Sequence, residues 1–273
     1  MIIIYSVAAA LVALLGVYAF LIAPGKLPKT APEILWRTRY AHRGLHDQKH
    51  AAPPENSLAA FRAAVEAGYG IELDINLTTD DTVAVFHDDS LLRMCGVDKP
   101  VADCSWEELL QYRLSGTEQR IPLFTEVLAE VAGRVPLIVE LKSTKRNTAL
   151  CEKAAALLDA YAGPYCVESF HPGIVAWFKK HRPDVVRGQL ATGYKDYGRR
   201  AAWQRMMLSG MLANAAARPH FAAFRHENAH GRFKLWLYRL LGGKLVGWTV
   251  RDTDDIAWCQ RFFDAIIFEY FRP

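Results

Sequence analysis

The sequence lacks paired cysteines. Its five cysteines are scattered along 273 residues, and no two of them form a CxxC pair: Cys95, Cys104, Cys151, Cys166 and Cys259. An odd number at irregular spacing excludes a disulfide framework and a zinc knuckle. We therefore expect buried free thiols in a reducing compartment.

The chain also lacks a strong excess of charge. Its 33 Lys and Arg residues against 29 Asp and Glu residues give a formal net charge of +4. No basic cluster accompanies a recognisable nucleic-acid-binding motif, so a nucleic acid is not an expected partner. With 51% hydrophobic residues, a chain of this length can form one large α/β barrel or two small domains.

No charged side chain occurs between Met1 and Gly25. The apolar run from Ile2 to Ala23 is long enough to cross, as a helix, a bilayer core of about 30 Å. A cleaved signal peptide would need a basic stretch before a shorter apolar core, and neither is present. A buried core helix is a third alternative. We expect a transmembrane helix over residues 1–25.

The segment after this apolar run is basic and rich in proline. Lys26, Lys29, Arg37 and Arg39 stand against a single acid, Glu33. Positive charge on this flank favours its location in the cytoplasm. We expect residues 26–37 to form a juxtamembrane linker and residues 38–273 to form a cytoplasmic domain of a single-pass membrane protein.

The stretch from Gly70 to Asp89 carries the most information. Acidic and amide side chains alternate with apolar ones, which is typical of a strand: Glu72, Asp74 and Asn76 against Leu73, Ile75 and Leu77. A second alternating run ends at His87, and the two runs predict a hairpin. If Asp80-Asp81 is the turn, Asp74 lies opposite His87 with Cβ atoms about 5 Å apart. A shift of one residue would move His87 to the other face, and an ordinary solvent-facing hairpin remains the alternative.

Strands and helices alternate through the rest of the chain. A strand ending at His42, a helix capped by Asn56 or Ser57 and the strand described above form a right-handed βαβ unit. Residues 89–120 are expected to form a small insertion over the site, with a short helix capped by Ser105. Further strands are predicted at 135–142, 165–170, 185–190, 221–225, 244–250 and 265–269. Eight strands alternating with helices predict an α/β fold, a (β/α)8 TIM barrel with a hairpin and insertion after its second strand.

Chemistry in such a barrel is carried by the carboxyl ends of its strands. Those ends here bring together the following side chains: His42-Arg43, Glu72, Asp74, Glu140, Lys142, Phe170-His171 and Trp248. With His87 they suffice for a metal-assisted phosphodiester reaction. Three carboxylates would hold a divalent metal ion, and the side chains of Arg43 and Lys142 would neutralise the phosphate. Two histidines would act as base and acid.

Structural roles are the alternatives for these residues. His42 and His87 could be structural residues whose hydrogen bonds are made within the fold. Glu140 and Lys142 could form an ion pair inside the barrel, although buried ion pairs seldom add net stability. Four further histidines are expected at the surface: His46, His50, His226 and His230. Residues 194–217 are expected to form a barrel helix with a solvated basic face, or alternatively an interfacial helix resting on anionic lipid.

The ordered motifs resemble the glycerophosphodiester phosphodiesterase family, within the phospholipase-C-like phosphodiesterase barrels. They occur in family order from residue 41 to the C-terminus: His42-Arg43-Gly44, Pro54-Glu55-Asn56-Ser57, Glu72-Leu73-Asp74, His87-Asp88, Glu140-Leu141-Lys142, Ser169-Phe170 and Trp248-Thr249-Val250. Each piece alone is weakly specific, but the ordered set is strongly so.

The resemblance implies a role for each matching residue. Glu72, Asp74 and Glu140 would bind Ca²⁺ or Mg²⁺, and His42 and His87 would be the acid/base pair. Arg43 and Lys142 would bind the phosphate, with Glu55 in a supporting role, and we expect Trp248 to contact the glycerol. The implied reaction yields sn-glycerol 3-phosphate and an alcohol.

Two positions depart from the family pattern. The last strand reads Ile267–Pro273 without the usual Thr-Asp, so the resemblance does not define the closing strand or part of the alcohol pocket. In the hairpin, Asp80-Asp81 replaces the usual Asp-Gly turn. Two other functions stay open. One is a lysophospholipase D acting on membrane lysolipids. The other is a non-catalytic barrel that binds a phosphodiester or a partner protein.

Overall fold

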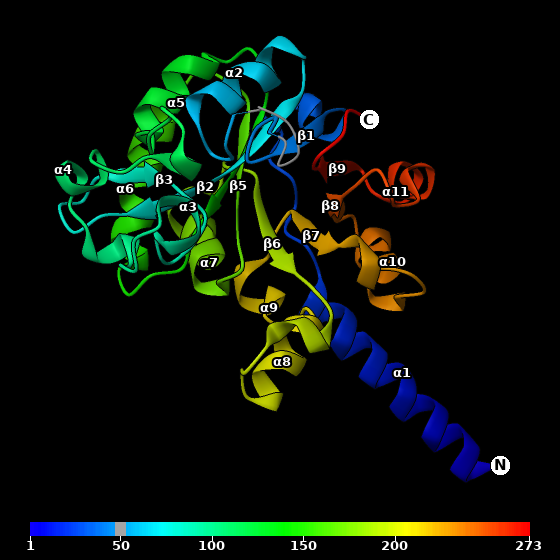
Figure 1. The fold of residues 1–273 in the computed structure, drawn as a ribbon. Coiled ribbons are helices and arrows are strands. Elements are labelled where there is room, and N and C mark those ends of the chain that lie inside the picture. Colours follow the sequence, from blue (N-terminus) through cyan, green and yellow to red (C-terminus); the bar gives the residue numbers. More distant parts are fainter. Residues whose placement is uncertain (47–52) are drawn as a thin grey trace.

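A closed barrel of parallel strands forms the centre of the computed structural model, which describes residues 1–46 and 53–273. The strands found in these residues are β1 (Arg39–His42), β2 (Gly70–Leu77), β3 (Val83–Val85), β4 (Leu137–Leu141), β5 (Tyr165–Ser169), β6 (Arg187–Ala191), β7 (Phe221–Arg225), β8 (Lys244–Val250) and β9 (Ala265–Phe268). Eight strands close because β1 pairs in parallel with both β2 and β9, while β3 adds an antiparallel arm to β2. The predicted (β/α)8 barrel is confirmed (Figure 1).

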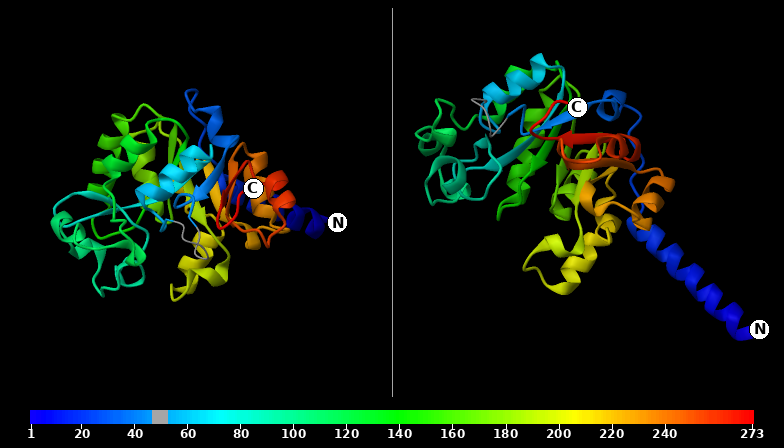
Figure 2. Two further views of the ribbon diagram at one scale, coloured as in Figure 1. Left: turned by 45° about the horizontal axis from the view of Figure 1, so that its top comes forward. Right: turned by 45° about the vertical axis from the view of Figure 1, so that its right-hand side comes forward.

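Helices surround this barrel on its outside (Figures 1 and 2). The α-helices in the described residues are α1 (Ile2–Ile22), α2 (Leu58–Glu66), α3 (Leu92–Cys95), α4 (Trp106–Leu109), α5 (Phe124–Val131), α6 (Asn147–Asp159), α7 (Pro172–His181), α8 (Ala202–Ser209), α9 (Asn214–Ala217), α10 (Phe233–Leu240) and α11 (Ile256–Phe262). The 3-10 turns are η1 (Glu33–Trp36), η2 (Val101–Asp103), η3 (Leu114–Gly116), η4 (Tyr194–Tyr197) and η5 (His226–Asn228).

Apolar side chains fill the barrel on both sides of its strands. Tyr40, Ile138 and Phe221 belong to the cluster inside the barrel, and a larger cluster joins the outer faces of β2 and β4 to α2, α5, α6 and α7. Gly70 has to be glycine because a Cβ there would lie 2.7 Å from the Tyr40 ring. The interior is therefore packed solid below the carboxyl ends of the strands, and polar side chains collect above it.

The hairpin of β2 and β3 forms as predicted, but with a different register. Ile75 pairs with Val85, and the Phe86 N–H donates to the Asp74 carbonyl oxygen (3.0 Å). Asp74 thus faces Phe86, and the prediction that it faces His87 is wrong. The cause is a three-residue turn in which Asp81 takes a positive φ of 61°, instead of the two-residue turn that we assumed.

The stretch over 194–217 is broken, although we predicted one long helix. Gly198 and Met211 take positive φ values of 59° and 60°, and they separate η4, α8 and α9. No residue of α8 is buried. The helix therefore presents apolar as well as basic side chains to the outside.

The insertion after β3 has a small apolar core of its own. Ser105 caps α4 as predicted, accepting a hydrogen bond from the Glu108 N–H (3.3 Å). The cluster joins Ala84 and Phe86 to residues of the insertion: Leu91, Met94, Val101, Leu109 and Leu114. A cavity of about 530 Å³ lies between the insertion and the residues that follow β4.

Helix α1 projects away from the barrel and packs only at its C-terminal end (Figures 1 and 2). It is long and apolar enough to cross a membrane. Ile22 is fully buried, the Tyr18 hydroxyl donates to the Gly210 carbonyl oxygen (3.1 Å), and the Asn214 amide donates to the Ile22 carbonyl oxygen (3.3 Å). The last turn of α1 is therefore part of the core shared with α9 and α10.

Candidate active site

Three buried carboxylates meet at the carboxyl ends of β2 and β4. Asp74 pairs in register with Glu140 across the two strands, and Glu72 lies two residues earlier on the same face. One oxygen atom of each carboxylate lies within 4.8 Å of the others. The predicted alternation of β2 therefore directs its acids into the barrel, where the packed core excludes bulk water.

Two cations partly balance these acids. Lys142 Nζ lies 3.0 Å from Glu140 Oε1 and 3.4 Å from Asp74 Oδ1. Arg43 Nε lies 3.4 Å from Asp74 Oδ2, and its backbone N–H donates to Glu72 Oε2 (3.2 Å). Of the two predicted cap residues, Ser57 caps α2, while Asn56 donates to Asp74 Oδ2 (2.9 Å) and orients that carboxylate.

The carboxylates differ in how readily they ionise. Burial opposes ionisation of Asp74, but the charge of Lys142 and further interactions hold its pKa well below the usual range. Burial and the neighbouring charge of Asp74 raise the pKa of Glu72 well above normal. Burial also raises the pKa of Glu140, against the opposing charge of Lys142. With all three carboxyl groups ionised, the cluster would carry one negative charge more than Lys142 and Arg43 neutralise, and the raised pKa values of Glu72 and Glu140 reflect this excess.

Glu168 adds a fourth carboxylate that our sequence reasoning missed. Glu168 lies on β5 and pairs in register with Glu140 of β4. Its side chain is buried, with 2% of the residue exposed, and its Oε2 has no hydrogen-bond partner among the described residues. Burial, followed by the charges of Glu140 and Asp74, raises its pKa well above normal. Its position on the inward face of the strand pattern Tyr165–Ser169 was the available signal.

His42 lies at the end of β1, beside the carboxylates. Its Nε2 is 3.9 Å from Glu72 Oε2, and its Nδ1 is 3.3 Å from Glu269 Oε1. Burial and the charge of Arg43 lower the pKa of His42 to about 4, although Glu269 opposes this shift. His42 is therefore neutral at physiological pH, with Nε2 directed to the cluster and Nδ1 to Glu269.

Glu269 follows β9, where the sequence departs from the family pattern. Burial alone would raise its pKa, but the hydrogen bond with His42 and the nearby charges bring the pKa to about 2. Arg251 Nη2 donates to its other oxygen (2.9 Å). Glu269 thus stays ionised and orients the imidazole of His42, a role that sequence reasoning missed.

His87 reaches the same site from the loop after β3. The side chain of Asn76 donates to the Phe86 carbonyl oxygen (2.9 Å) and fixes the start of this loop. His87 Nδ1 lies 2.6 Å from Asp88 Oδ1. The charge of His87 contributes to the low pKa of Asp74, so His87 lies near the acids although its backbone is not directly opposite Asp74.

An arginine network connects the two histidine sides of the site. Arg93 donates to Asp88 (2.6 Å) and to Glu55 (2.6 Å), and Arg43 donates to Glu55 (2.8 Å). Glu55 is 6% exposed. The predicted supporting residue therefore joins Arg43 to the Asp88 that holds His87.

Trp248 and Phe170 face each other at the rim of the site. Their rings form an edge-to-face pair with centroids 5.6 Å apart. The indole Nε1 of Trp248 is buried and has no hydrogen-bond partner among the described residues. A buried unpaired donor beside an aromatic ring suits a hydroxyl-bearing ligand.

Two of the histidines expected at the surface are buried instead. His46 packs edge-on against Tyr270 (5.3 Å) and lies 3.8 Å from Glu269. His226 lies 3.2 Å from Asp254. Both expectations were wrong because contacts with distant loops, which have no periodic sequence signal, bury these rings. His230 is exposed as expected, and His50 lies outside the described residues.

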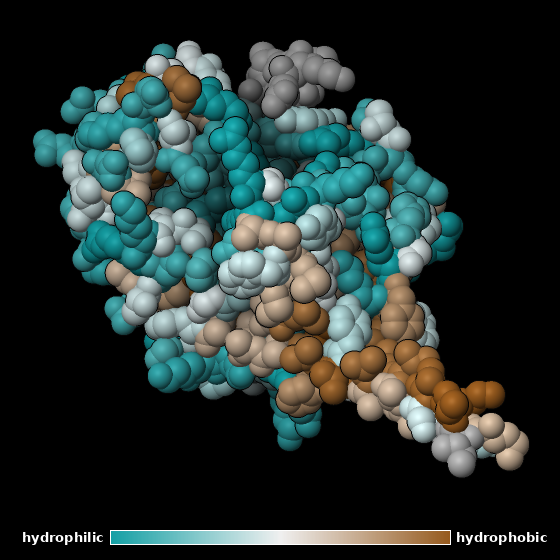
Figure 3. All heavy atoms as spheres, turned by 90° about the horizontal axis from the view of Figure 1, so that it is seen from below, coloured by the Kyte–Doolittle hydropathy of each residue, from teal (hydrophilic) through white to brown (hydrophobic). Residues whose placement is uncertain are grey.

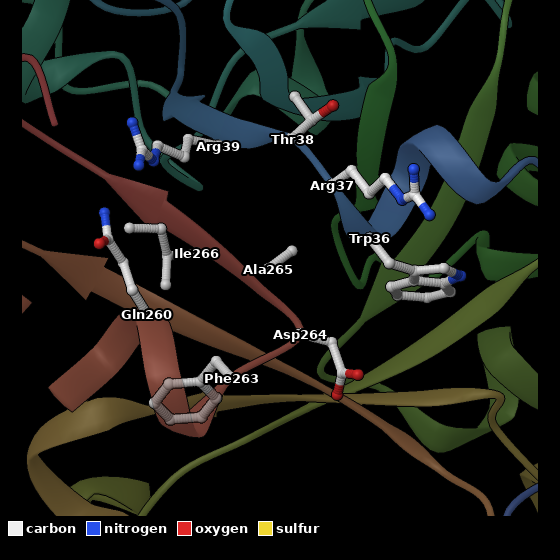
Figure 4. Close-up of a pocket in the computed structure, with 9 residues that line it drawn as sticks. All are labelled: Trp36, Arg37, Thr38, Arg39, Gln260, Phe263, Asp264, Ala265 and Ile266. Atoms are coloured by element: carbon white, nitrogen blue, oxygen red, sulfur yellow. The ribbon is translucent and has the colours of Figure 1, made fainter. Parts of the chain in front are cut away.

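A cavity at the opposite end of the barrel has different chemistry. It has a volume of about 180 Å³ and lies where β1 and β9 begin (Figure 4). Asp264 is the one acid among the described residues that line it, and Lys244 (2.9 Å) and Arg239 (3.3 Å) pair with it. This cavity lacks the cluster of acids and histidines that characterises the carboxyl end.

Oxygen donors of this kind fit a hard divalent cation. Ca²⁺ and Mg²⁺ prefer carboxylate oxygens, and the cluster offers three buried carboxyl groups within reach of one ion. The fold and the site together define a phosphodiesterase-type parallel barrel: an acidic cluster, two adjacent cations and two histidines at the carboxyl ends of the strands.

Comparison with known proteins identifies the family. Residues 42–270 match the model of the glycerophosphoryl diester phosphodiesterase family, and the chain belongs to this family. A glycerophosphodiester phosphodiesterase of Bacillus altitudinis is 35% identical over 159 residues, 54% of this chain and 63% of the relative. Lysophospholipase D GDPD1 of Rattus norvegicus is 35% identical over 120 residues, 39% of this chain and 37% of the relative. The matches thus span less than two thirds of these relatives.

A solved structure shares the fold over most of the chain. A phosphodiesterase of Oleispira antarctica, in complex with the product sn-glycerol-3-phosphate, superposes with a TM-score of 0.68 at 21% identity. The superposition covers 85% of this chain and 93% of the other. The barrel is therefore the fold expected for this family.

Proposed function

We propose that this chain is a metal-dependent hydrolase that converts glycerophosphodiesters into sn-glycerol 3-phosphate and an alcohol. One observation carries the proposal: three buried carboxylates from β2 and β4 meet beside His42, with His87 close enough for its charge to lower the pKa of Asp74. Family membership supports the substrate class. A bound Ca²⁺ or Mg²⁺ ion would polarise a phosphoryl oxygen, with Glu72, Asp74 and Glu140 as its ligands.

Arg43 and Lys142 bind the phosphate in this proposal. Both side chains lie beside Asp74, so a phosphate at the cluster would be within reach of both positive charges. Arg43 is held in place by Glu55 (2.8 Å). Fixed cations next to the reacting phosphorus stabilise the charge that develops as the water attacks.

The two histidines divide the proton transfers between them. Each has Nδ1 next to a carboxylate, Glu269 for His42 and Asp88 for His87, which leaves both Nε2 atoms for the reaction. His42 is neutral, as its lowered pKa requires, and takes the proton of the attacking water. His87 gives a proton to the oxygen of the leaving alcohol, so the two protons balance.

The N-terminal helix supports a membrane location. Its last turn is buried in the core of the domain, which argues for retention of the helix as an anchor and against its removal as a signal sequence. The basic residues that follow it favour a cytoplasmic domain. This anchor, together with the lysophospholipase D relative, favours a second candidate activity: release of the head group from a lysophospholipid in the bilayer.

Turnover by purified protein tests the proposal. Phosphorus NMR of glycerophosphocholine and of a lysophosphatidylcholine, with and without chelator, identifies each product. We expect Glu72→Gln and His42→Ala to abolish turnover, while Glu130→Gln, a carboxylate on the outer helix α5, retains it. Near-normal activity of either site variant refutes the assignment. Metal-dependent thermal stabilisation without turnover of any diester would instead support a non-catalytic barrel.

A further inference from the structure

A second cavity opens next to the proposed catalytic groups, beside α8. Its volume is about 330 Å³, within the range of small-molecule sites. Most of the side chains that line it are apolar: Phe170, Pro172, Trp203, Met207, Leu208 and Ala213. Apolar cavities of this kind bind apolar groups, because displacing water from such walls is favourable.

The cavity borders the proposed catalytic groups through two of its lining residues, Ser143 and Phe170. Ser143, which lines it, directly follows Lys142 at the end of β4. Phe170, which also lines it, packs edge-to-face against Trp248. A ligand with its phosphate at Lys142 and its glycerol beside Trp248 would therefore direct any longer substituent past Phe170 into this cavity.

Helix α8 lines the cavity and also carries exposed apolar side chains. Trp203 is 64% exposed and Met206 is 57% exposed. A helix on a soluble barrel normally turns an apolar stripe toward the core, but α8 buries none of its residues. Trp203 and Met206 are therefore available to contact a partner outside the polypeptide.

The anchor helix indicates that this partner is a bilayer. Tyr18 of α1 donates to Gly210, the residue that ends α8, so α8 lies beside the base of the proposed membrane span. The arrowhead of β6 in Figure 1 points to the end of the barrel where α8 lies. Figure 3 views the molecule from that end, and apolar atoms extend along α1 and around its junction with the domain, beside a hydrophilic hollow.

We propose that the cavity beside α8 binds the hydrocarbon chain of a single-chain phospholipid, which enters from the bilayer surface along α8. The inference rests on the proposed function, since it extends the same catalytic site. Trp203 and Met207 contact the chain in the interface, and Phe170 separates the chain from the reacting phosphate. The polar alcohol leaves on the other side of Ser143, where the larger cavity of about 530 Å³ has polar and charged walls.

Chain-length dependence tests this subsite directly. The substrates are glycerophosphocholine and a series of lysophosphatidylcholines of increasing acyl length, presented to the detergent-solubilised full chain below their aggregation concentrations. The enzymes are the wild type, Trp203→Ala, which opens the cavity wall, and Ala213→Phe, which fills the cavity. Trp236→Ala is the matched control, because Trp236 is a similarly exposed tryptophan (56%) on α10 and does not line the cavity.

We expect kcat/KM to rise about fourfold for each methylene group that enters the cavity, and then to level off. The ratio of kcat/KM for a long lysolipid to that for glycerophosphocholine should fall at least about tenfold in Trp203→Ala and in Ala213→Phe, equivalent to losing two methylene contacts. The ratio should be unchanged in Trp236→Ala. Using a ratio separates the subsite from any general loss of activity.

Different outcomes overturn different statements. If glycerophosphocholine is hydrolysed but lysolipids show no gain with length, or if the variants keep the wild-type ratio, the acyl-chain site is wrong while the proposed function stands. If neither substrate type is hydrolysed under any metal condition, the proposed function fails and this inference fails with it. If Trp203→Ala turns a dimer into a monomer without changing the ratio, a second copy of the chain covers the cavity and the inference is wrong.

Discussion

Replacing Glu269 with glutamine tests how His42 is positioned. In the structure, Glu269 Oε1 lies 3.3 Å from His42 Nδ1, and the carboxylate is almost fully buried. Glutamine keeps the size of the side chain but removes its negative charge. The imidazole then loses both the charged acceptor at Nδ1 and the preference for the orientation that directs Nε2 to the cluster.

The expected loss follows from the strength of that single contact. A hydrogen bond to a charged group contributes about 1.5–3 kcal/mol, and each 1.36 kcal/mol corresponds to about tenfold in rate. We therefore expect kcat to fall about 10- to 100-fold while KM changes little, because Glu269 does not contact the substrate phosphate. Stability should change little, since Arg251, which loses its partner, has a side chain that is 47% exposed.

A pH–rate profile separates positioning from general damage. The pKa of His42 is about 4, because burial and the charge of Arg43 lower it more than Glu269 raises it. Removing the charge therefore lowers this pKa further. Because His42 acts as a base in its neutral form, the acid limb of kcat/KM should move to lower pH in Glu269→Gln.

The control for this experiment is Glu130→Gln, which removes a carboxylate that pairs with Arg62 on the outside of the barrel. It should keep the wild-type rate and profile. Wild-type kcat in Glu269→Gln, or an acid limb displaced to higher pH, would refute the role of Glu269.

The remaining predictions concern His87, the carboxylate cluster and helix α1. Asp88→Asn, which neutralises the partner of His87 Nδ1 at 2.6 Å, should lower kcat about 10- to 100-fold in steady-state assays with little change in KM; an unchanged kcat contradicts the acid role of His87. Burial and nearby charge raise the pKa values of Glu72 and Glu140, so these two groups keep protons in the metal-free native state and their contribution to stability falls as pH rises above about 4.5. Added Ca²⁺ should therefore raise Tm in scanning fluorimetry more at mildly alkaline than at mildly acidic pH, and an equal or reversed shift argues against a metal at the cluster. Ile22→Ala should lower the free energy of unfolding in detergent by about 2–5 kcal/mol, whereas Ile3→Ala, at an exposed position (79%), should not; equal effects would show that α1 does not share the core.

The barrel could be predicted because its signals are local and repeated. Each strand is a short apolar or alternating run followed by a helical pattern, and β5, β7 and β8 begin at the predicted residues. The cluster could also be anticipated, since parallel strands place their carboxyl ends at one face. Alternation along β2 was enough to direct Glu72 and Asp74 to the same side.

Features that depend on backbone detail were not accessible in this way. The hairpin register changes with a single positive φ at Asp81. An aspartate can adopt either sign of φ in a turn, so its presence in the sequence does not predict this conformation. The break of the predicted helix at Gly198 and Met211 has a similar origin. In each case the sequence pattern was compatible with more than one local geometry.

Contacts between distant segments were missed for another reason. Glu269 and His42 are 227 residues apart, and they meet only because β9 closes the barrel beside β1. Glu168 followed the strand pattern, but nothing in its neighbours distinguished it from a structural residue. Asp88 directly follows His87 in the sequence. Its carboxylate is also held by Arg93 of the insertion, a contact that the sequence pattern does not predict.

Calorimetric titration of chelator-treated protein with Ca²⁺ or Mg²⁺, with hydrolysis of a glycerophosphodiester followed in parallel, tests the central claim most directly. The account predicts one saturable site per chain, activity that returns as that site fills, and loss of both in Glu140→Gln. Full hydrolysis by the metal-free protein, or equal binding by Glu140→Gln, would contradict it.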